Sequence, residues 1–386
     1  MVLTNIHRSL ICIVIFVGCT TMVSAMDQVT FRHKGREMTE SGRLLVTAQD
    51  GGLLLLGRDG VIWAIAPDEL IKHTSDVAPF EPFTRDEMVK RMFAVLPKNF
   101  EVLPTNQYKH YLIFYETSRP YAQWCGSLFE RLYMAFTNYW SHKGFELTEP
   151  EFPLVAVIFA DKQAYLKFSR ADLGTAGESI VGYFHLATNR MTMYDLTGAA
   201  SAGRQSVMVS NAAQINQILA QPEALQTVST IIHEATHQIA FNCGLHTRLS
   251  DCPVWFSEGI AVFFETPDLR SANGRNGIGA VNQPRLDLFQ KYLTYRPSDS
   301  LITLLATDKR LHDAKQSLTA YAEAWALTYF LIKKHPKEYV AYLQMLSKKK
   351  PLMRDTPETR LNEFQQAFGD INKLDTEFFR FMSRVR

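Results

Sequence analysis

The feature that most constrains this chain is a His-Glu-Ala-Thr-His pentad at residues 233–237, which a Trp-Phe-Ser-Glu-Gly segment follows at residues 255–259. On a helix, residues four positions apart project from one face, so His233 and His237 can bind one metal ion together. Glu234 lies beside them, where it can hold a water on that metal, and Glu258 offers a third ligand. Two imidazoles, one carboxylate and an open fourth position make a hydrolytic zinc site, in which Zn²⁺ supplies hydroxide near neutral pH.

The residues around the pentad predict a helix that is mostly apolar. Pro222 lies where a first helical turn begins, and Gly244 follows the last apolar residue, where a C-cap belongs. Apolar side chains recur between them at helical spacing. The alternative interpretation is a solvated helix face of His and Glu, which fits an apolar helix poorly. The pattern therefore favours a metal site.

The composition argues against nucleic acid as a partner. The chain has 386 residues and a formal net charge of +2, and it contains no long basic run. Its 46% of hydrophobic residues can bury a large core. The length suits one main domain with a smaller attachment.

Residues 1–25 have the pattern of a signal peptide. Arg8 precedes an apolar run at residues 10–17, and Val-Ser-Ala at 23–25 offers a small-residue cleavage site. The apolar run is too short to span a bilayer comfortably. We therefore expect an exported protein, periplasmic or secreted, with no stable membrane span after the signal is removed. The alternatives are an uncleaved anchor and a lipid anchor at Cys19, whose preceding residues resemble a lipobox.

Export to an oxidising compartment changes what the cysteines predict. Cys243 and Cys252 are expected to form a disulfide that closes the turn between the two metal-binding segments. Two reduced thiols, or a thiolate bound to the metal, are the alternatives. Cys125 is left without a partner and is expected to be a small, buried apolar residue.

Residues 26–80 predict a small β-rich N-terminal region that ends in a linker. Apolar runs at residues 44–46, 53–56 and 61–65 are separated by turn signals that contain Asp and Gly. This pattern is typical of a β-meander. The segment 75–82 contains two prolines and is expected to be the linker.

Residues 81–386 predict an α+β fold in which strands and helices come first, then the metal-binding helix, and then mostly helices. The predicted strands are at residues 111–115, 154–160, 180–184 and 191–195. The predicted helices outside the pentad are at residues 85–95, 120–140, 162–170, 285–295, 301–307, 320–334, 336–348 and 359–368. Residues 197–205 are small and polar and predict a loop. This order suits a mixed sheet packed against an active-site helix.

The two metal-binding segments resemble those of the gluzincin metallopeptidases, in the peptidase MA-like clan that includes aminopeptidase N. The longer string from Pro253 to Ala261 is similar to an uncharacterised bacterial domain family of that clan. The resemblance covers roughly residues 95–370, and its specific part is the metal motif. It implies a zincin-like domain over residues 81–386 and a zinc-dependent activity on peptide or protein substrates.

The resemblance also implies a role for each residue of the motif. His233, His237 and Glu258 would be the three protein ligands of Zn²⁺. Glu234 would be the general base that polarises the zinc-bound water. An ordinary surface glutamate at a helix start is the alternative for Glu258.

Two further residues match the aminopeptidase N-like pattern. Glu265 would hold a ligand imidazole, and a solvated carboxylate at a helix end is the alternative. Tyr321 would stabilise the oxyanion of the tetrahedral intermediate, and a core tyrosine with a bonded hydroxyl is the alternative. The chain has no segment like the Gly-x-Met-Glu-Asn of the aminopeptidases, which captures the substrate's free amine. Endopeptidase activity is therefore expected.

Two functions of different classes fit these residues. The first is an exported zinc metallopeptidase. The second is a non-catalytic, zinc-stabilised binding module of the cell envelope, with the N-terminal β-rich region as its contact element. Glu234 favours the enzyme, because a structural zinc site needs no base and closes its fourth position.

Overall fold

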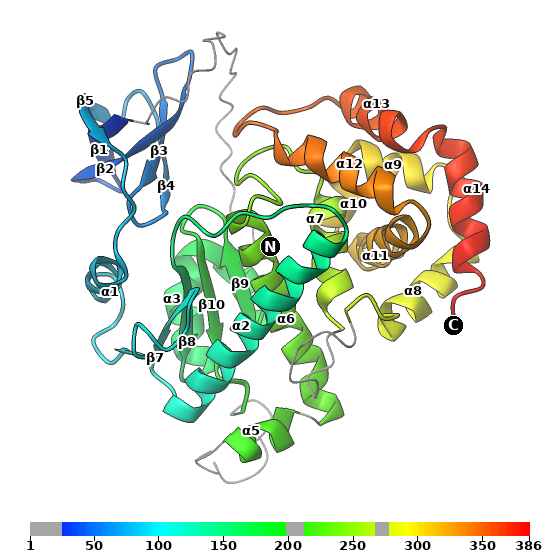
Figure 1. Cartoon of the computed structure of the whole chain (residues 1–386), viewed down its shortest axis with the longest axis horizontal. Coiled ribbons are helices and arrows are strands. Elements are labelled where there is room, and N and C mark those ends of the chain that lie inside the picture. Colours follow the sequence, from blue (N-terminus) through cyan, green and yellow to red (C-terminus); the bar gives the residue numbers. More distant parts are fainter. Residues whose placement is uncertain (1–24, 198–211, 220, 267–277) are drawn as a thin grey trace. The chain divides into compact units, whose positions relative to one another are not determined.

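The computed structural model describes residues 25–197, 212–219, 221–266 and 278–386 (Figure 1). The chain forms two compact units. Unit 1 holds the residues up to 126 together with 150–215, and unit 2 holds 127–149 together with 216–386. The predicted signal peptide up to residue 24, with Cys19, lies outside the described residues, as do residues 198–205 of the predicted loop.

Unit 1 begins with a five-stranded antiparallel sheet in the order β4-β3-β2-β1-β5. Its strands are β1 (Ala25–His33), β2 (Arg36–Thr47), β3 (Leu53–Gly57), β4 (Ile62–Ile65) and β5 (Leu70–Pro79). The first four are consecutive neighbours, which confirms the predicted meander. Val29 and Phe31 of β1 pack with Leu53 and Leu55 of β3 in its core.

The predicted linker at 75–82 is wrong for its first part, because residues 75–79 belong to β5 and pair with β1. Nine of the ten residues of β5 are exposed, so this edge strand has no apolar alternation that a sequence pattern could detect. Its partner β1 supplies the buried side chains.

The second sheet of unit 1 is mixed and has the order β6-β7-β8-β10-β9. Its strands are β6 (Glu101–Val102), β7 (Tyr111–Tyr115), β8 (Leu154–Phe159), β9 (Gly182–His185) and β10 (Arg190–Tyr194). The three inner strands are parallel and the two edge strands antiparallel. Every residue of β7 and β8 is buried, as expected for parallel strands covered on both faces. The four predicted strands are confirmed.

Along the chain, helices alternate with the strands at first, and the C-terminal part consists of helices. Those before residue 200 are α1 (Arg85–Phe93), α2 (Arg119–His142), α3 (Lys162–Leu173) and the 3₁₀ turn η1 (Gly174–Ser179). The later ones are α5 (Ala212–Leu219), α6 (Pro222–Asn242), α7 (Val254–Phe264), α8 (Gln283–Leu293), α9 (Ser300–Ala306), α10 (Lys309–His312), α11 (Ser317–Lys334), α12 (Pro336–Ser347), α13 (Pro357–Phe368) and α14 (Ile371–Met382). The molecule is therefore α+β with a helical C-terminal part, as predicted. No helix in the described part of the chain has the length and apolar character needed to cross a membrane.

The ends of α6 follow from its sequence. Gln221 is the N-cap and Pro222 occupies the first helical turn, where a missing amide hydrogen costs nothing. After the cap at Cys243, Gly244 adopts a φ of +79°, a conformation that favours glycine. The helix therefore runs without interruption through the whole pentad.

Candidate metal centre

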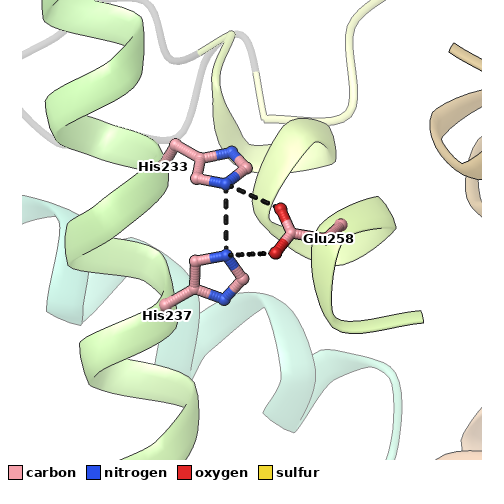
Figure 2. Close-up of side chains that lie close together, drawn as sticks. All are labelled: His233, His237 and Glu258. Atoms are coloured by element: carbon pink, nitrogen blue, oxygen red, sulfur yellow. Dashed lines mark hydrogen bonds and ion pairs between the residues drawn. The ribbon is translucent and has the colours of Figure 1, made fainter. Parts of the chain in front are cut away.

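The pentad and the second segment meet in unit 2. His233 and His237 lie one turn apart on α6, and Glu258 on α7 faces both of them (Figure 2). The Nε2 atoms of the two imidazoles are 3.1 Å apart. The Glu258 carboxylate lies 3.0 Å from Nε2 of His233 and 3.5 Å from Nε2 of His237. All three side chains are buried, and their ligand atoms lie within 4.8 Å of one another.

This geometry fits a metal ion. In a tetrahedral site with bond lengths of about 2.0–2.2 Å, neighbouring ligand atoms are roughly 3.3–3.6 Å apart. The three measured separations lie close to that range. Two imidazole nitrogens this close cannot both carry a proton. A metal ion bound to both lone pairs therefore stabilises the pair better than one hydrogen bond does. His233, His237 and Glu258 are therefore the residues that can hold a metal.

Glu258 reaches this position because α7 is buried along its whole length. All eleven residues from Val254 to Phe264 are buried, and Glu258 is only 1% exposed. Gly259 allows α7 to approach α11 closely. A Cβ at this glycine would lie 2.1 Å from Oγ1 of Thr328 and 2.9 Å from the carbonyl oxygen of Ala324.

The N-terminal end of α7 is held by an ionic network. The backbone N–H of Val254 donates to Asp308 at 3.0 Å. Arg360 of α13 donates to both carboxylate oxygens of Asp308, and it binds Asp251 in a bidentate pair at 2.8 and 3.0 Å. Arg360 therefore ties together the segment before α7, the segment after α9, and α13.

Burial and the ligand contacts set the protonation of the cluster in opposite directions. Burial disfavours an imidazolium, but hydrogen bonds to Glu258 and Glu265 outweigh it and raise the pKa of His233 to about 9. Burial dominates at His237 and lowers its pKa. Burial would raise the pKa of Glu258, yet the charge of His237 and hydrogen bonds to His233 and His237 hold that pKa below its usual range. The carboxylate is therefore ionised, as a metal ligand must be.

Glu265 contacts Nδ1 of His233, the ring nitrogen that does not contact Glu258. Its Oε1 lies 2.8 Å from Nδ1 of His233, and its Oε2 accepts a hydrogen bond of 3.1 Å from Nδ2 of Asn282. A carboxylate only accepts, so Nδ1 of His233 carries the proton and Nε2 faces Glu258 and His237. This contact can orient the imidazole of a candidate metal ligand, which is the role that the resemblance implies for Glu265. Glu265 is the cap residue that ends α7.

Glu234 lies on α6 and Tyr321 on α11. Glu234 is 5% exposed and follows His233 by one position on α6. The negative charges of Glu258 and Glu234, together with burial, raise the pKa of Tyr321 above its ordinary range. Its hydroxyl therefore stays protonated at neutral pH. Tyr321 therefore lies near the candidate metal centre, and its role at an oxyanion stays a prediction.

Two residues near Glu265 were not identified from the sequence. Asn282 caps α8 by accepting a hydrogen bond of 3.3 Å from the N–H of Arg285, while its amide donates to Glu265. The guanidinium of Arg285 lies 3.7 Å from Glu265 and 6.0 Å from the ring centre of Tyr321. The Asn-Gln-Pro sequence at 282–284 carries a helix-start signal that indicates the cap. Nothing in the local sequence of Arg285 indicates its place at this centre.

The expected disulfide between Cys243 and Cys252 is absent from the structure. Among the described residues Cys125, Cys243 and Cys252 are all free. Burial raises the pKa of Cys243 to about 12, and its thiol bonds to Tyr133. The sulfur of Cys252 lies 3.7 Å from Nδ1 of His246. The two thiols therefore have different partners, which nearness in sequence could not reveal. Cys125 is fully buried, as predicted.

Comparison with known families gives a match over the part of the chain that contains these residues. A family described as a protein of unknown function, DUF1570, matches residues 227–353. This stretch contains His233, Glu234, His237, Glu258 and Tyr321. No curated protein matches the chain.

Proposed function

We propose that this protein is an exported, zinc-dependent peptidase of the gluzincin type, which hydrolyses peptide bonds within peptide or protein substrates. One observation carries the proposal. A buried ligand set of His233, His237 and Glu258 lies beside a glutamate on the same helix and a protonated tyrosine from α11. A structural site has no use for the last two groups.

The ligand chemistry favours zinc among the divalent metals. Two imidazoles and one carboxylate form a nitrogen-rich set of the kind found in catalytic zinc sites with three protein ligands. Magnesium and calcium prefer oxygen ligands throughout, which this cluster does not provide. A bound Zn²⁺ would lower the pKa of a water and polarise the carbonyl of a substrate.

The chain's own residues account for the proton transfers that amide hydrolysis requires. Glu234 accepts a proton from the attacking water and delivers it to the amine that leaves. The Tyr321 hydroxyl donates a hydrogen bond to the oxygen that becomes negative in the transition state. Its raised pKa keeps the proton on the hydroxyl at neutral pH, so it can act as a donor. Glu265 keeps His233 in the tautomer whose Nε2 would bind the metal.

The choice of substrate and compartment rests on the sequence. The metal motif resembles that of gluzincin peptidases, and the amine-capturing segment of aminopeptidases is absent from the sequence. These features favour cleavage within a chain rather than at its N-terminus. The signal-peptide pattern of residues 1–25 favours a periplasmic or secreted enzyme.

The first test is metal content. Protein purified without chelators should contain about one zinc per chain by elemental analysis. His237→Ala should release the metal. His142→Ala, which changes an exposed histidine on α2, is the matched control and should retain it. Wild-type protein that binds no zinc, even after the ion is added, would refute the metal site.

The second test separates the base from the ligand. Glu234→Gln keeps the shape of the side chain but removes its basicity, so zinc should stay while cleavage of a proteome-derived peptide library falls by at least about a hundredfold. Glu258→Ala removes a ligand and should lower both zinc content and cleavage. Glu338→Gln, at an exposed position of α12, is the control and should change neither.

A binding module gives a different result in the same assays. Wild-type protein that holds zinc and cleaves no peptide in the library would favour the non-catalytic, zinc-stabilised module over the enzyme. Equal cleavage rates for the wild type and Glu234→Gln would refute the mechanism.

A further inference from the structure

Arg285 is a cation near the candidate metal centre, and its guanidinium donates no hydrogen bond to any residue that the structure describes. It lies in the first turn of α8, and its side chain is 24% exposed. A guanidinium has five N–H donors. Within the described part of the chain it forms one ion pair, at 3.7 Å from Oε1 of Glu265, and its guanidinium makes no hydrogen bond.

Neutralising Glu265 does not explain this arginine. The two oxygens of Glu265 already accept hydrogen bonds from His233 and Asn282, at 2.8 and 3.1 Å. A separation of 3.7 Å is too long for a hydrogen bond to Arg285. The buried Arg360 differs in this respect, since it makes four hydrogen bonds to two aspartates. The donors of Arg285 are therefore available to a ligand.

The position of Arg285 places that ligand beside the reacting bond. Its guanidinium carbon lies 6.0 Å from the ring centre of Tyr321, and one guanidinium nitrogen lies 3.7 Å from the Glu265 oxygen that contacts Nδ1 of His233 at 2.8 Å. An extended residue spans at most about 3.3–3.6 Å, so a group bound at Arg285 lies within about two residues of a carbonyl held at the metal. Substrate contacts at this distance determine which bond is cleaved.

We infer that Arg285 binds a carboxylate of the substrate within about two residues of the cleaved bond, and that the enzyme prefers substrates with an acidic group there. This inference rests on the proposed peptidase function. Carboxylate is the group whose geometry matches a guanidinium, through two parallel N–H···O bonds. The carboxylates of Glu234, Glu258 and Glu265 repel an anion from the rest of the centre. A substrate carboxylate is therefore expected to bind only beside the guanidinium of Arg285.

A peptide offers this carboxylate from two sources, its C-terminus and an Asp or Glu side chain. A peptide that the wild type cleaves should be made in four forms: with a C-terminal acid or amide, and with Glu or Gln next to the cleaved bond. The carboxylate form that reaches Arg285 should have a kcat/KM about tenfold or more above its neutral counterpart, mostly through KM. A preference for the C-terminal acid over the amide identifies the C-terminus as the group bound, and a preference for Glu over Gln identifies a side chain.

Variants connect the preference with Arg285. Arg285→Met should reduce the ratio of kcat/KM between the acidic and the neutral peptide to about one. Arg285→Lys should restore part of this ratio, because a lysine keeps the positive charge but cannot form two parallel hydrogen bonds. Lys291→Met, an exposed change on the same helix, is the control and should leave the ratio as in the wild type. An arginine that only stabilised the fold would lower all four rates together. A preference that survives in Arg285→Met, or its absence in the wild type, would overturn the inference.

Binding supplies a second measurement that does not depend on turnover. Zinc-loaded Glu234→Gln should bind a fluorescein-labelled hexapeptide that contains one glutamate, with affinity falling about tenfold or more when Arg285→Met is added. Fluorescence polarisation measures this change. Equal affinity with and without Arg285 would overturn the inference even if cleavage were confirmed. If the wild type cleaves no peptide but the difference in affinity is observed, the result counts against the peptidase function and leaves the binding role of Arg285 standing.

Discussion

Gly259 offers the sharpest test of how the metal centre is built, because it allows the helix that carries Glu258 to approach α11. An alanine at this position adds one methyl group. Its Cβ would lie 2.1 Å from Oγ1 of Thr328 and 2.9 Å from the carbonyl oxygen of Ala324. Ordinary non-bonded contact begins at about 3.5 Å, so the two helices must move apart by roughly 1 Å.

The expected magnitude follows from two opposing effects. Overpacking a well-filled core costs about 1–3 kcal/mol, and the upper end applies here because a backbone oxygen cannot rotate away. Replacing glycine in a helix stabilises by about 1 kcal/mol through lower backbone entropy. We therefore expect Gly259→Ala to reduce the free energy of unfolding by about 2 kcal/mol. It should also weaken zinc retention, because Glu258 is the adjacent residue.

Denaturant unfolding measures this loss, with fluorescence as the signal. Trp255 on α7 and Trp325 on α11 are fully buried and report on these two helices. Thr328→Ala removes the shorter of the two contacts and leaves the contact with the backbone. The double variant should therefore be more stable than the sum of the single changes by about 1 kcal/mol. Stability of Gly259→Ala at or above that of the wild type, or strict additivity, would show that this approach does not limit the packing.

Three further predictions concern the surroundings of α7. Arg360→Met should reduce the free energy of unfolding by about 3–5 kcal/mol, because it leaves the buried Asp251 without its counter-charge, and urea unfolding should detect this change. Hydrogen bonds and charge from Arg360 hold the pKa of Asp251 below its ordinary value although burial opposes this. Its stabilising contribution should therefore be complete above about pH 4 and be lost as the pH falls through the lowered pKa, and Asp251→Asn should unfold with a shallower dependence on pH in that window. Cys243 and Cys252 should both react with a thiol reagent after denaturation without reductant, and a cross-linked peptide in mass spectrometry would contradict this prediction.

The ligand set and the secondary structure follow from local patterns in the sequence. The spacing of His233 and His237 on a helix places both imidazoles on one face whatever surrounds the helix. Pro222 and Gly244 mark its two ends, and apolar runs mark the buried strands. These signals depend on neighbours within a few residues, so they can be read without knowledge of the fold.

Other features depend on contacts between residues far apart in the chain. The edge strand β5 has almost no buried residue, so only its pairing with β1 makes it a strand. Cys243 and Cys252 are close in sequence, yet their thiols bond to Tyr133 and approach His246 instead of each other. Sequence spacing therefore could not decide their pairing.

The sequence by itself determined which side chains can bind the metal, because helical periodicity is a property of the local backbone. Only the tertiary structure decided what surrounds them. Glu258 meets the imidazoles because Gly259 lets α7 pack against α11, and Arg285 reaches Tyr321 because α8 begins beside Glu265. Both arrangements depend on how whole helices pack, and packing is set by the sum of many contacts that no short stretch of sequence contains.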